Sequence, residues 1–171
     1  GIGFAFQQPV RFKGIQVLDL IRIAKGKRLA VADACHYLSA VGLCARDYID
    51  REVNSSLSGG ELKRIEIATV LARGTALSVF DEPEAGIDLW SFKNLIEVFE
   101  SMRKNIENSS ILIISHQERI LEIADEIIVL KDGSITARGT KDEVLPGLIS
   151  SHDVSVECRA GDIPKGVAVN G

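Results

Sequence analysis

The chain contains no Gly-x-x-x-x-Gly-Lys-Ser/Thr motif, and its only methionine is Met102. That motif forms the loop whose backbone amides and lysine hold the phosphates of many nucleotides. The first residue is Gly1, and the apolar residues directly after it already have the character of a buried strand. We therefore expect the chain to be processed or cut, and not to begin at its natural start codon.

Cysteine is also scarce, and the chain has neither a surplus of basic charge nor a long apolar run. The three cysteines, Cys35, Cys44 and Cys158, lack Cys-x-x-Cys spacing, so we expect reduced thiols and no metal site built from them. The net charge of −4 argues against a nucleic-acid partner, because nucleic-acid-binding domains carry a basic surplus. No apolar run approaches the roughly 18 residues that span a membrane, and no signal peptide is visible. A cytoplasmic location is the default expectation.

The 171 residues are enough for one domain with a real core, and strand and helix patterns alternate along them. Such alternation, with polar residues after the strands, predicts an α/β fold with an open parallel sheet. A helical subdomain is expected over about 16–73, and Asp132-Gly133 predicts a β-hairpin near the C-terminus. The predicted strands are 2–6, 76–80, 111–114, 126–130 and 134–138, and the predicted helices begin near 17, 31, 60, 88, 118 and 140. The apolar run 111–114 predicts a strand covered on both faces, the last helix is expected to end near 149, and 150–171 are expected to form a mobile tail.

The sequence Ser58-Gly59-Gly60-Glu61 opens one of the predicted helices. A serine at this place is a good helix N-cap, worth ~1 kcal/mol. Two consecutive glycines add flexibility that a cap does not need, but that a close approach of the backbone to a ligand does need. The turn therefore predicts a phosphate-binding helix N-terminus.

Two adjacent carboxylates, Asp81 and Glu82, follow the predicted strand 76–80. A carboxylate held rigidly at a strand end suits Mg²⁺, so Asp81 is the predicted metal ligand. Glu82 is the predicted general base for a water, a role that contributes about 10²- to 10⁴-fold in rate. The alternative, a solvated acidic pair before the turn at Pro83, loses weight because other polar motifs follow neighbouring strands.

Three further polar residues stand at the ends or starts of predicted elements. Gln7 follows the first strand, where its amide can reach the metal and the attacking water. His116 follows the strand 111–114 and is a candidate donor to a terminal phosphate. Asp88 is either the N-cap of the long helix or a further nucleotide-binding residue, and both roles stay open.

Taken in order, five segments resemble the motifs of the ATP-binding cassette (ABC) ATPases. Gln7 matches the Q-loop, LeuSerGlyGlyGlu at 57–61 the signature motif, and LeuSerValPheAspGlu at 77–82 the Walker B motif with its glutamate. GluAlaGlyIleAsp at 84–88 matches the D-loop, and His116 matches the switch histidine. The signature ends in Glu61 where the family more often has Gln. The D-loop sequence GluAlaGlyIleAsp also differs from the commoner Thr/Ser-Ser/Ala-Gly-Leu-Asp. The resemblance covers residues 1–149, which we expect to form one ABC ATPase domain with a partial P-loop NTPase fold.

The resemblance implies ATP and Mg²⁺ as cofactors and an ATP-dependent homodimer as the working form. Glu82 and His116 would be catalytic, and Asp81 and Gln7 would hold the metal. The nucleotide would be bound by Ser58, Gly59, Gly60, Glu61, Gln7 and Asp88, with Ser58 and Gly60 acting across the dimer and Gln7 acting in its own subunit. The Walker A loop precedes the Q-loop in this family, so we expect the given chain alone to bind and hydrolyse little ATP.

Within the family, the sequence near three motifs resembles that of the ATPase subunit of the Suf iron–sulfur cluster assembly system. The segments are PheAlaPheGlnGlnPro at 4–9, SerGlyGlyGluLeuLysArg at 58–64 and HisGlnGluArgIleLeu at 116–121. This implies an ATPase that drives cluster assembly on Suf-type scaffold proteins. The alternatives are the ATP-binding subunit of a membrane transporter, which would bind a permease, and a non-catalytic interaction module.

Overall fold

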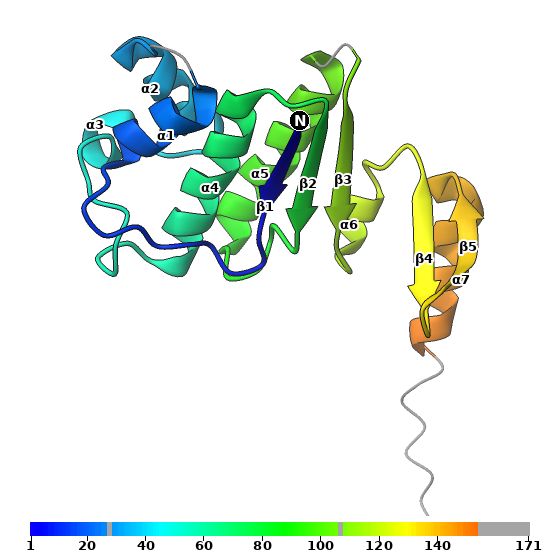
Figure 1. The fold of residues 1–171 in the computed structure, drawn as a ribbon. Helices are drawn as coiled ribbons and strands as arrows, with labels where there is room; N and C mark the ends of the chain where they lie inside the picture. The colour runs from blue at the N-terminus through cyan, green and yellow to red at the C-terminus, as the bar shows by residue number, and fades with distance from the viewer. Residues whose placement is uncertain (27–28, 106–107, 154–171) are drawn as a thin grey trace, which may run out of the picture. The chain divides into compact units, whose positions relative to one another are not determined.

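A computed structural model describes residues 1–26, 29–105 and 108–153. The chain divides into two compact units, Gly1–Ile123 and Ala124–Gly171, and each is described by itself. The elements of the first unit alternate between strand and helix along the chain (Figure 1). This arrangement confirms the α/β prediction, whereas the expected domain boundary at 149 stays a prediction.

Three parallel strands form the sheet of the first unit. They are β1 (Ile2–Ala5), β2 (Leu77–Asp81) and β3 (Ser110–Ile114), in the spatial order β1-β2-β3. The register pairs Ala5 with Phe80 and Phe80 with Ile113, so the three strands end at nearly the same level. The segments after the three strands therefore meet at one edge of the sheet, as the rule for open α/β sheets requires.

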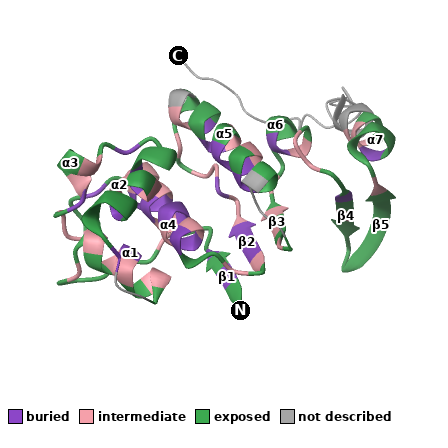
Figure 2. Cartoon of the chain, turned by 90° about the horizontal axis from the view of Figure 1, so that it is seen from above, coloured by how far each residue is buried: buried purple, intermediate pink, exposed green. Residues whose placement is uncertain are grey.

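Two long helices, α4 (Gly59–Arg73) and α5 (Leu89–Asn105), cover one face of this sheet. Phe80 on that face is fully buried and meets Phe99 of α5 edge-on, with ring centroids 5.0 Å apart. Gly3 on β1 leaves room for α4, because a Cβ there would lie 3.2 Å from a methyl group of Val70. Figure 2 shows α4 and β2 as the most continuously buried elements, so the core lies between them.

The helical subdomain comprises α1 (Val17–Lys25), α2 (Val31–Ala40) and the short α3 (Ala45–Tyr48). The helix α1 ends as expected at Gly26, whose φ of 65° is the left-handed conformation that glycine adopts without strain. Val17 and Ile21 of α1 and Leu38 of α2 are fully buried in the same core cluster as residues of α4. The subdomain is therefore packed on α4, the helix that begins at the Ser-Gly-Gly turn.

The other face of the sheet is open, which corrects the expectation that 111–114 would be covered on both faces. Leu112 is 47% exposed and Ile114 is 49% exposed, and Phe4 on β1 is 41% exposed on the same face. The described helices of this unit supply cover only for the face that carries Ala5 and Phe80. The apolar run was correctly predicted as a parallel strand, but the pattern alone does not reveal whether a second layer is present.

The second unit contains β4 (Ile127–Lys131), β5 (Ser134–Gly139) and α7 (Lys141–Asp153), and the short α6 (Glu118–Leu121) belongs to the first unit. The strands β4 and β5 pair antiparallel through Asp132 and Gly133, whose positive φ values of 50° and 76° confirm the predicted hairpin turn. The helix α7 continues past its predicted end at 149, and the predicted tail over 154–171 lies outside the described residues. No helix in the described part of the chain is long and apolar enough to span a membrane.

Candidate functional site at the carboxyl edge of the sheet

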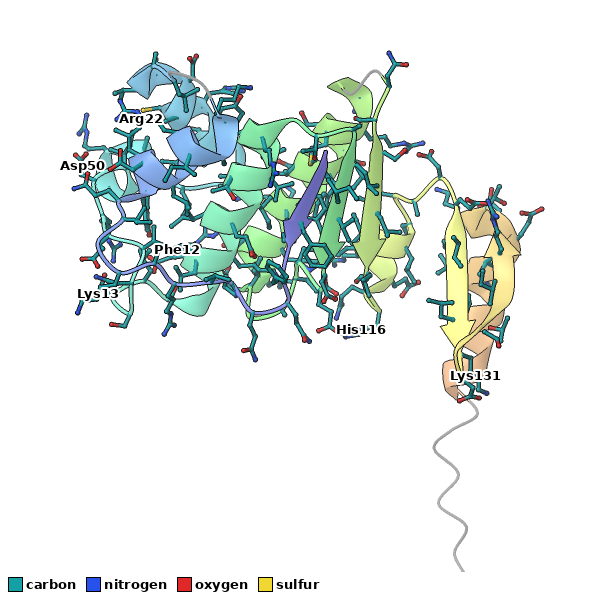
Figure 3. The ribbon with its side chains drawn as sticks, viewed as in Figure 1. Phe12, Lys13, Arg22, Asp50, His116 and Lys131 are labelled. Carbon is teal, nitrogen blue, oxygen red and sulfur yellow. The ribbon has the colours of Figure 1, made fainter. Side chains whose placement is uncertain are left out.

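The predicted site residues Gln7, Asp81, Glu82 and His116 lie at the ends of three neighbouring parallel strands. Gln7 lies two residues after β1, Asp81 is the last residue of β2, and His116 lies two residues after β3. Figure 3 shows His116 just beyond the carboxyl end of its strand. The parallel register thus gathers residues from distant parts of the sequence at one edge.

One direct contact joins two of these residues. The Gln7 Nε2 atom donates a hydrogen bond of 2.6 Å to Glu82 Oε2. Because the amide nitrogen is engaged in this way, the amide oxygen of Gln7 keeps its lone pairs for a metal or a water. Glu82 has a φ of 41°, an uncommon conformation for a residue other than glycine, and such strain is often found at functional sites.

The Ser58 turn is a capping box. Ser58 Oγ accepts a hydrogen bond of 3.2 Å from the backbone nitrogen of Glu61, and the Glu61 carboxylate accepts one of 2.6 Å from the backbone nitrogen of Ser58. The Ser58 hydroxyl accepts in this contact, so its own proton is still available for donation. Gly59 and Gly60 begin the helix, where backbone N–H groups lack intrahelical acceptors. The turn therefore has the geometry of an anion-binding helix N-terminus.

Two residues that the sequence pattern did not single out hold Glu61. The Tyr48 hydroxyl donates a hydrogen bond of 2.5 Å to Glu61 Oε1, and Arg51 Nη1 lies 3.8 Å from the same oxygen. The bond from Tyr48, followed by the one from the Ser58 backbone, lowers the pKa of the Glu61 carboxyl, and the same bond to Glu61 raises the pKa of Tyr48. Glu61 is therefore held as a carboxylate, balanced by Arg51. These contacts join the helical subdomain to α4. They could not be predicted from the spacing of residues along the chain.

A fully buried lysine, Lys63, is the second feature that sequence reasoning missed. Its Nζ atom donates to the backbone oxygens of Phe6, of Gln7 at 3.2 Å and of Asp81 at 3.1 Å. Burial lowers the pKa of Lys63, and nearby carboxylates, with Glu66 first, oppose that change. Since Lys63 lies on α4, this one side chain joins the helix of the Ser-Gly-Gly turn to the ends of β1 and β2.

Asp88 has the first of its two predicted roles. Its Oδ1 accepts a hydrogen bond of 3.0 Å from the backbone nitrogen of Ser91, so it caps the start of α5. The second role, in binding nucleotide, stays a prediction.

The side chains at the edge fit Mg²⁺ bound together with a nucleotide, and not a dedicated metal cage. No group of three or more His, Cys, Asp or Glu side chains that could hold a metal occurs among the described residues. Mg²⁺ usually keeps several waters and takes one or two carboxylates plus substrate phosphates. Asp81 as the carboxylate and Gln7 as a neutral oxygen ligand match that pattern.

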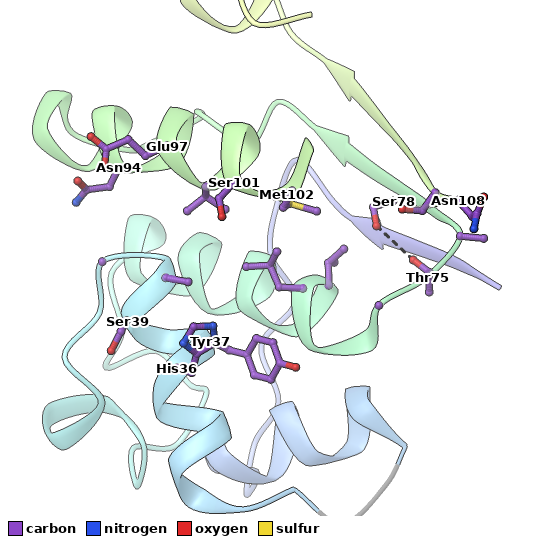
Figure 4. Close-up of a pocket in the computed structure, with 18 residues that line it drawn as sticks. His36, Tyr37, Ser39, Thr75, Ser78, Asn94, Glu97, Ser101, Met102 and Asn108 are labelled. Atoms are coloured by element: carbon purple, nitrogen blue, oxygen red, sulfur yellow. Dashed lines mark hydrogen bonds between the residues drawn. The ribbon is translucent and has the colours of Figure 1, made fainter. Parts of the chain in front are cut away.

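A pocket of about 820 Å³ lies elsewhere in the first unit. It is formed by α2, the end of α4, the amino end of β2 and α5, where His36 and Tyr37 lie opposite Asn94 and Ser101 (Figure 4). None of the predicted site residues lines it. The chemistry predicted from sequence therefore belongs to the open carboxyl edge of the sheet and not to this pocket.

The fold and the edge define a class: an α/β protein with the P-loop NTPase type of fold, whose polar groups stand at the ends of parallel strands. The family profile described as ABC transporter matches residues 1–85. An ATP-binding cassette solved as a dimer in a post-hydrolysis state, bound to ADP and Pi, superposes with a TM-score of 0.71 at 20% identity. That match covers 82% of this chain and 62% of the other. The chain is thus similar over most of its length to an ABC transporter ATP-binding protein, and its fold is that of an ABC ATPase cassette.

Two curated relatives show how the chain compares in length. An uncharacterized ABC transporter ATP-binding protein of Methanocaldococcus jannaschii is 35% identical over 150 residues, which are 84% of this chain and 59% of that protein. An energy-coupling factor transporter ATP-binding protein of Ureaplasma parvum is 35% identical over 164 residues, covering 91% of this chain and 37% of that protein. The chain thus spans well under two thirds of the length of these relatives.

Proposed function

We propose that this chain is part of an ATP-binding subunit that hydrolyses ATP with Mg²⁺ as an ATP-dependent homodimer. The observation that carries the proposal is the meeting of Gln7, Asp81, Glu82 and His116 at one edge of the sheet, with Gln7 bonded to Glu82. ATP hydrolysis is a trait of the ABC ATPase family, and the similar cassette was solved as a dimer bound to ADP and Pi.

In this proposal each motif has a distinct task. Bound Mg²⁺ would neutralise phosphate charge, and Asp81 with Gln7 would hold it. Glu82 accepts a proton from the attacking water, and His116 donates to the terminal phosphate. The hydrogen bond from Gln7 orients the Glu82 carboxylate before substrate arrives.

The Ser58 turn serves the second nucleotide of the dimer. Ser58, Gly59 and Gly60 present a hydroxyl and backbone amides to the phosphate bound by the other subunit. Glu61 keeps the turn in shape through the capping box, and Arg51 balances its charge.

The names of the curated relatives favour membrane transport as the process that ATP hydrolysis powers. The two relatives are called ABC transporter and energy-coupling factor transporter ATP-binding proteins. A permease is then the expected partner, and the cytoplasmic location expected from sequence stays a prediction.

Iron–sulfur cluster assembly is the second candidate. It is favoured by the sequence similarity to Suf ATPases at residues 4–9, 58–64 and 116–121. The two relatives described above, which are named as transporter proteins, give it no direct support. Copurification separates the two candidates, because transport predicts an integral membrane partner and assembly predicts scaffold proteins.

The replacement Glu82→Gln tests the proposed activity. In the full-length protein, we expect ATP binding to persist and hydrolysis to fall by about 10²- to 10⁴-fold, because the amide cannot accept the proton from water. The dimer should then accumulate with ATP bound, measurable by size-exclusion chromatography. Glu97→Gln, on the exposed side of α5, is the matched control and should keep normal turnover. Unchanged hydrolysis in Glu82→Gln would show that Glu82 is not the base.

A further inference from the structure

The residues that link β2 to α5, residues 82–88, form a tight turn, called here the 82–88 turn. Its backbone nitrogens donate internally, from Ala85 to the Glu82 oxygen at 3.0 Å and from Ile87 to the Glu84 oxygen at 3.1 Å. The Glu82 nitrogen also donates to the Ile114 oxygen at 2.9 Å, which attaches the turn to the end of β3. Hydrogen bonds therefore hold the conformation of the turn and attach it to the end of β3.

Glu84 makes a second attachment between the turn and the segment after β3. The Ser115 hydroxyl donates a hydrogen bond of 2.5 Å to Glu84 Oε1, and the same hydroxyl oxygen accepts one of 3.0 Å from the Gln117 nitrogen. Residues 115 and 117 flank His116 in the chain. Glu84 therefore holds both neighbours of His116, one directly and one through the Ser115 side chain.

The Glu84 carboxylate is in an unusual environment for a charged group. Its second oxygen is buried and accepts no hydrogen bond within the described part of the chain. A buried carboxylate oxygen without a donor costs free energy unless a nearby charge offsets it. Lys63 supplies such a charge, since Glu84 is among the carboxylates that act to raise the pKa of that lysine.

The opposite side of the 82–88 turn touches the start of α4. A Cβ atom on Gly60 would lie 3.1 Å from the backbone oxygen of Gly86. The 82–88 turn therefore contacts both Gly60, in the predicted phosphate-binding helix, and Ser115, which precedes His116, the predicted hydrogen-bond donor to the phosphate.

We propose that Glu84 is a positioning residue that fixes His116 through Ser115, so that His116 and Gly60 are held to the same rigid turn. The inference rests on the proposed function, because His116 matters only if it acts on a phosphate. Glu84 itself touches neither nucleotide nor metal in this scheme. It keeps the imidazole in place before the nucleotide binds, and correct placement of such a group affects rate more than affinity.

The first test measures ATP hydrolysis by the full-length protein carrying Glu84→Ala, Ser115→Ala or both. Each single change should lower kcat by about tenfold or more and leave KM for ATP within about twofold, because the placement of His116 and not ground-state binding is lost. The double variant should be no slower than either single variant, since both remove one contact. Glu84→Gln keeps an oxygen acceptor for Ser115 and should restore most of kcat. Additive losses, or a Glu84→Gln variant as slow as Glu84→Ala, would overturn the proposal.

The second test follows the imidazole of His116 by NMR in the same proteins and requires no turnover. The His116 resonances, assigned with His116→Gln, should shift in Glu84→Ala and in Ser115→Ala, while those of His36 stay in place. The exposed control Glu97→Gln should leave the His116 signal in place. Should the wild-type protein hydrolyse no ATP, the proposed function fails, but the NMR result still decides whether Glu84 fixes His116. If Glu84→Ala does not fold, Ser115→Ala, which loses only a hydroxyl, carries both tests, and an unmoved His116 signal in it overturns the proposal.

Discussion

At the scale of single residues, Lys63 connects more of the site than any residue predicted from sequence. Its ammonium group has three protons, and it donates to three backbone oxygens at the ends of β1 and β2. The side chain has an exposed fraction of 0%. Lys63 is therefore the shared donor of three carbonyl groups at the ends of these strands.

The replacement Lys63→Met should lower the free energy of unfolding by about 2–4 kcal/mol, because it removes a fully buried ammonium group that donates to three backbone oxygens. Methionine keeps a similar length and apolar stem, so the change isolates the ammonium group. Urea unfolding followed by circular dichroism measures the effect. Lys93→Met, an exposed position on α5, is the control and should change stability by no more than about 0.5 kcal/mol. Equal stability of the two variants would contradict the role given to Lys63.

At the scale of elements, the start of α4 is packed against the 82–88 turn through glycine. Gly59 and Gly60 are adjacent in the same helical turn, but their surroundings differ. A Cβ on Gly59 would meet nothing within 4 Å, whereas a Cβ on Gly60 would lie 3.1 Å from the Gly86 oxygen. The pair therefore offers a matched comparison between two glycines of one motif.

We expect Gly60→Ala to destabilise the protein by ~1 kcal/mol, because the new methyl group forces the hydrogen-bonded 82–88 turn away from α4. Gly59→Ala should be neutral or slightly stabilising, since alanine favours the helix more than glycine and the site is open. Thermal unfolding of both variants measures the difference. The same stability change in both would show that the contact with Gly86 does not matter.

At the scale of the whole molecule, one face of the parallel sheet leaves apolar side chains exposed. Phe4 on β1 and Leu112 and Ile114 on β3 are about half exposed on the same face of the sheet, on either side of β2, whose Val79 is buried. Parallel sheets are normally covered on both faces, and apolar side chains exposed on one sheet face mark a surface for contact or self-association.

Residues 1–171 produced alone should therefore bind a hydrophobic dye strongly and self-associate as concentration rises. The double replacement Leu112→Thr and Ile114→Thr keeps residues that favour strands and should weaken both effects. Dye fluorescence and sedimentation velocity provide the measurements. Ile23→Thr, which removes an exposed apolar side chain from α1, serves as the control and should change neither. Dye binding that is unaffected by the strand replacements would place the apolar surface elsewhere.

Apart from the short α3, which was not predicted, the order of strands and helices was predictable because local rules decide it. The periodicity of α4 and α5, the glycine ends of α1 and α4, and the Asp132-Gly133 turn are all set by residues near one another in the chain. The parallel edge with Gln7, Asp81 and His116 was predictable too, because parallel strands bring their carboxyl ends to one side of the sheet. The contacts of Tyr48, Lys63 and Glu84 were not, since each joins segments that only packing brings together.

The sequence alone showed that the Gly-Lys motif, a basic surplus and long apolar runs are absent and that cysteine is scarce, and it also showed the motif order and the α/β class. These properties depend on residue identity and on spacing along one chain. Only the tertiary structure decided that one sheet face is open, that a buried lysine ties α4 to two strand ends, and that Glu84 holds the neighbours of His116. Such contacts depend on burial and on distances between remote segments, which arise only when the chain is packed.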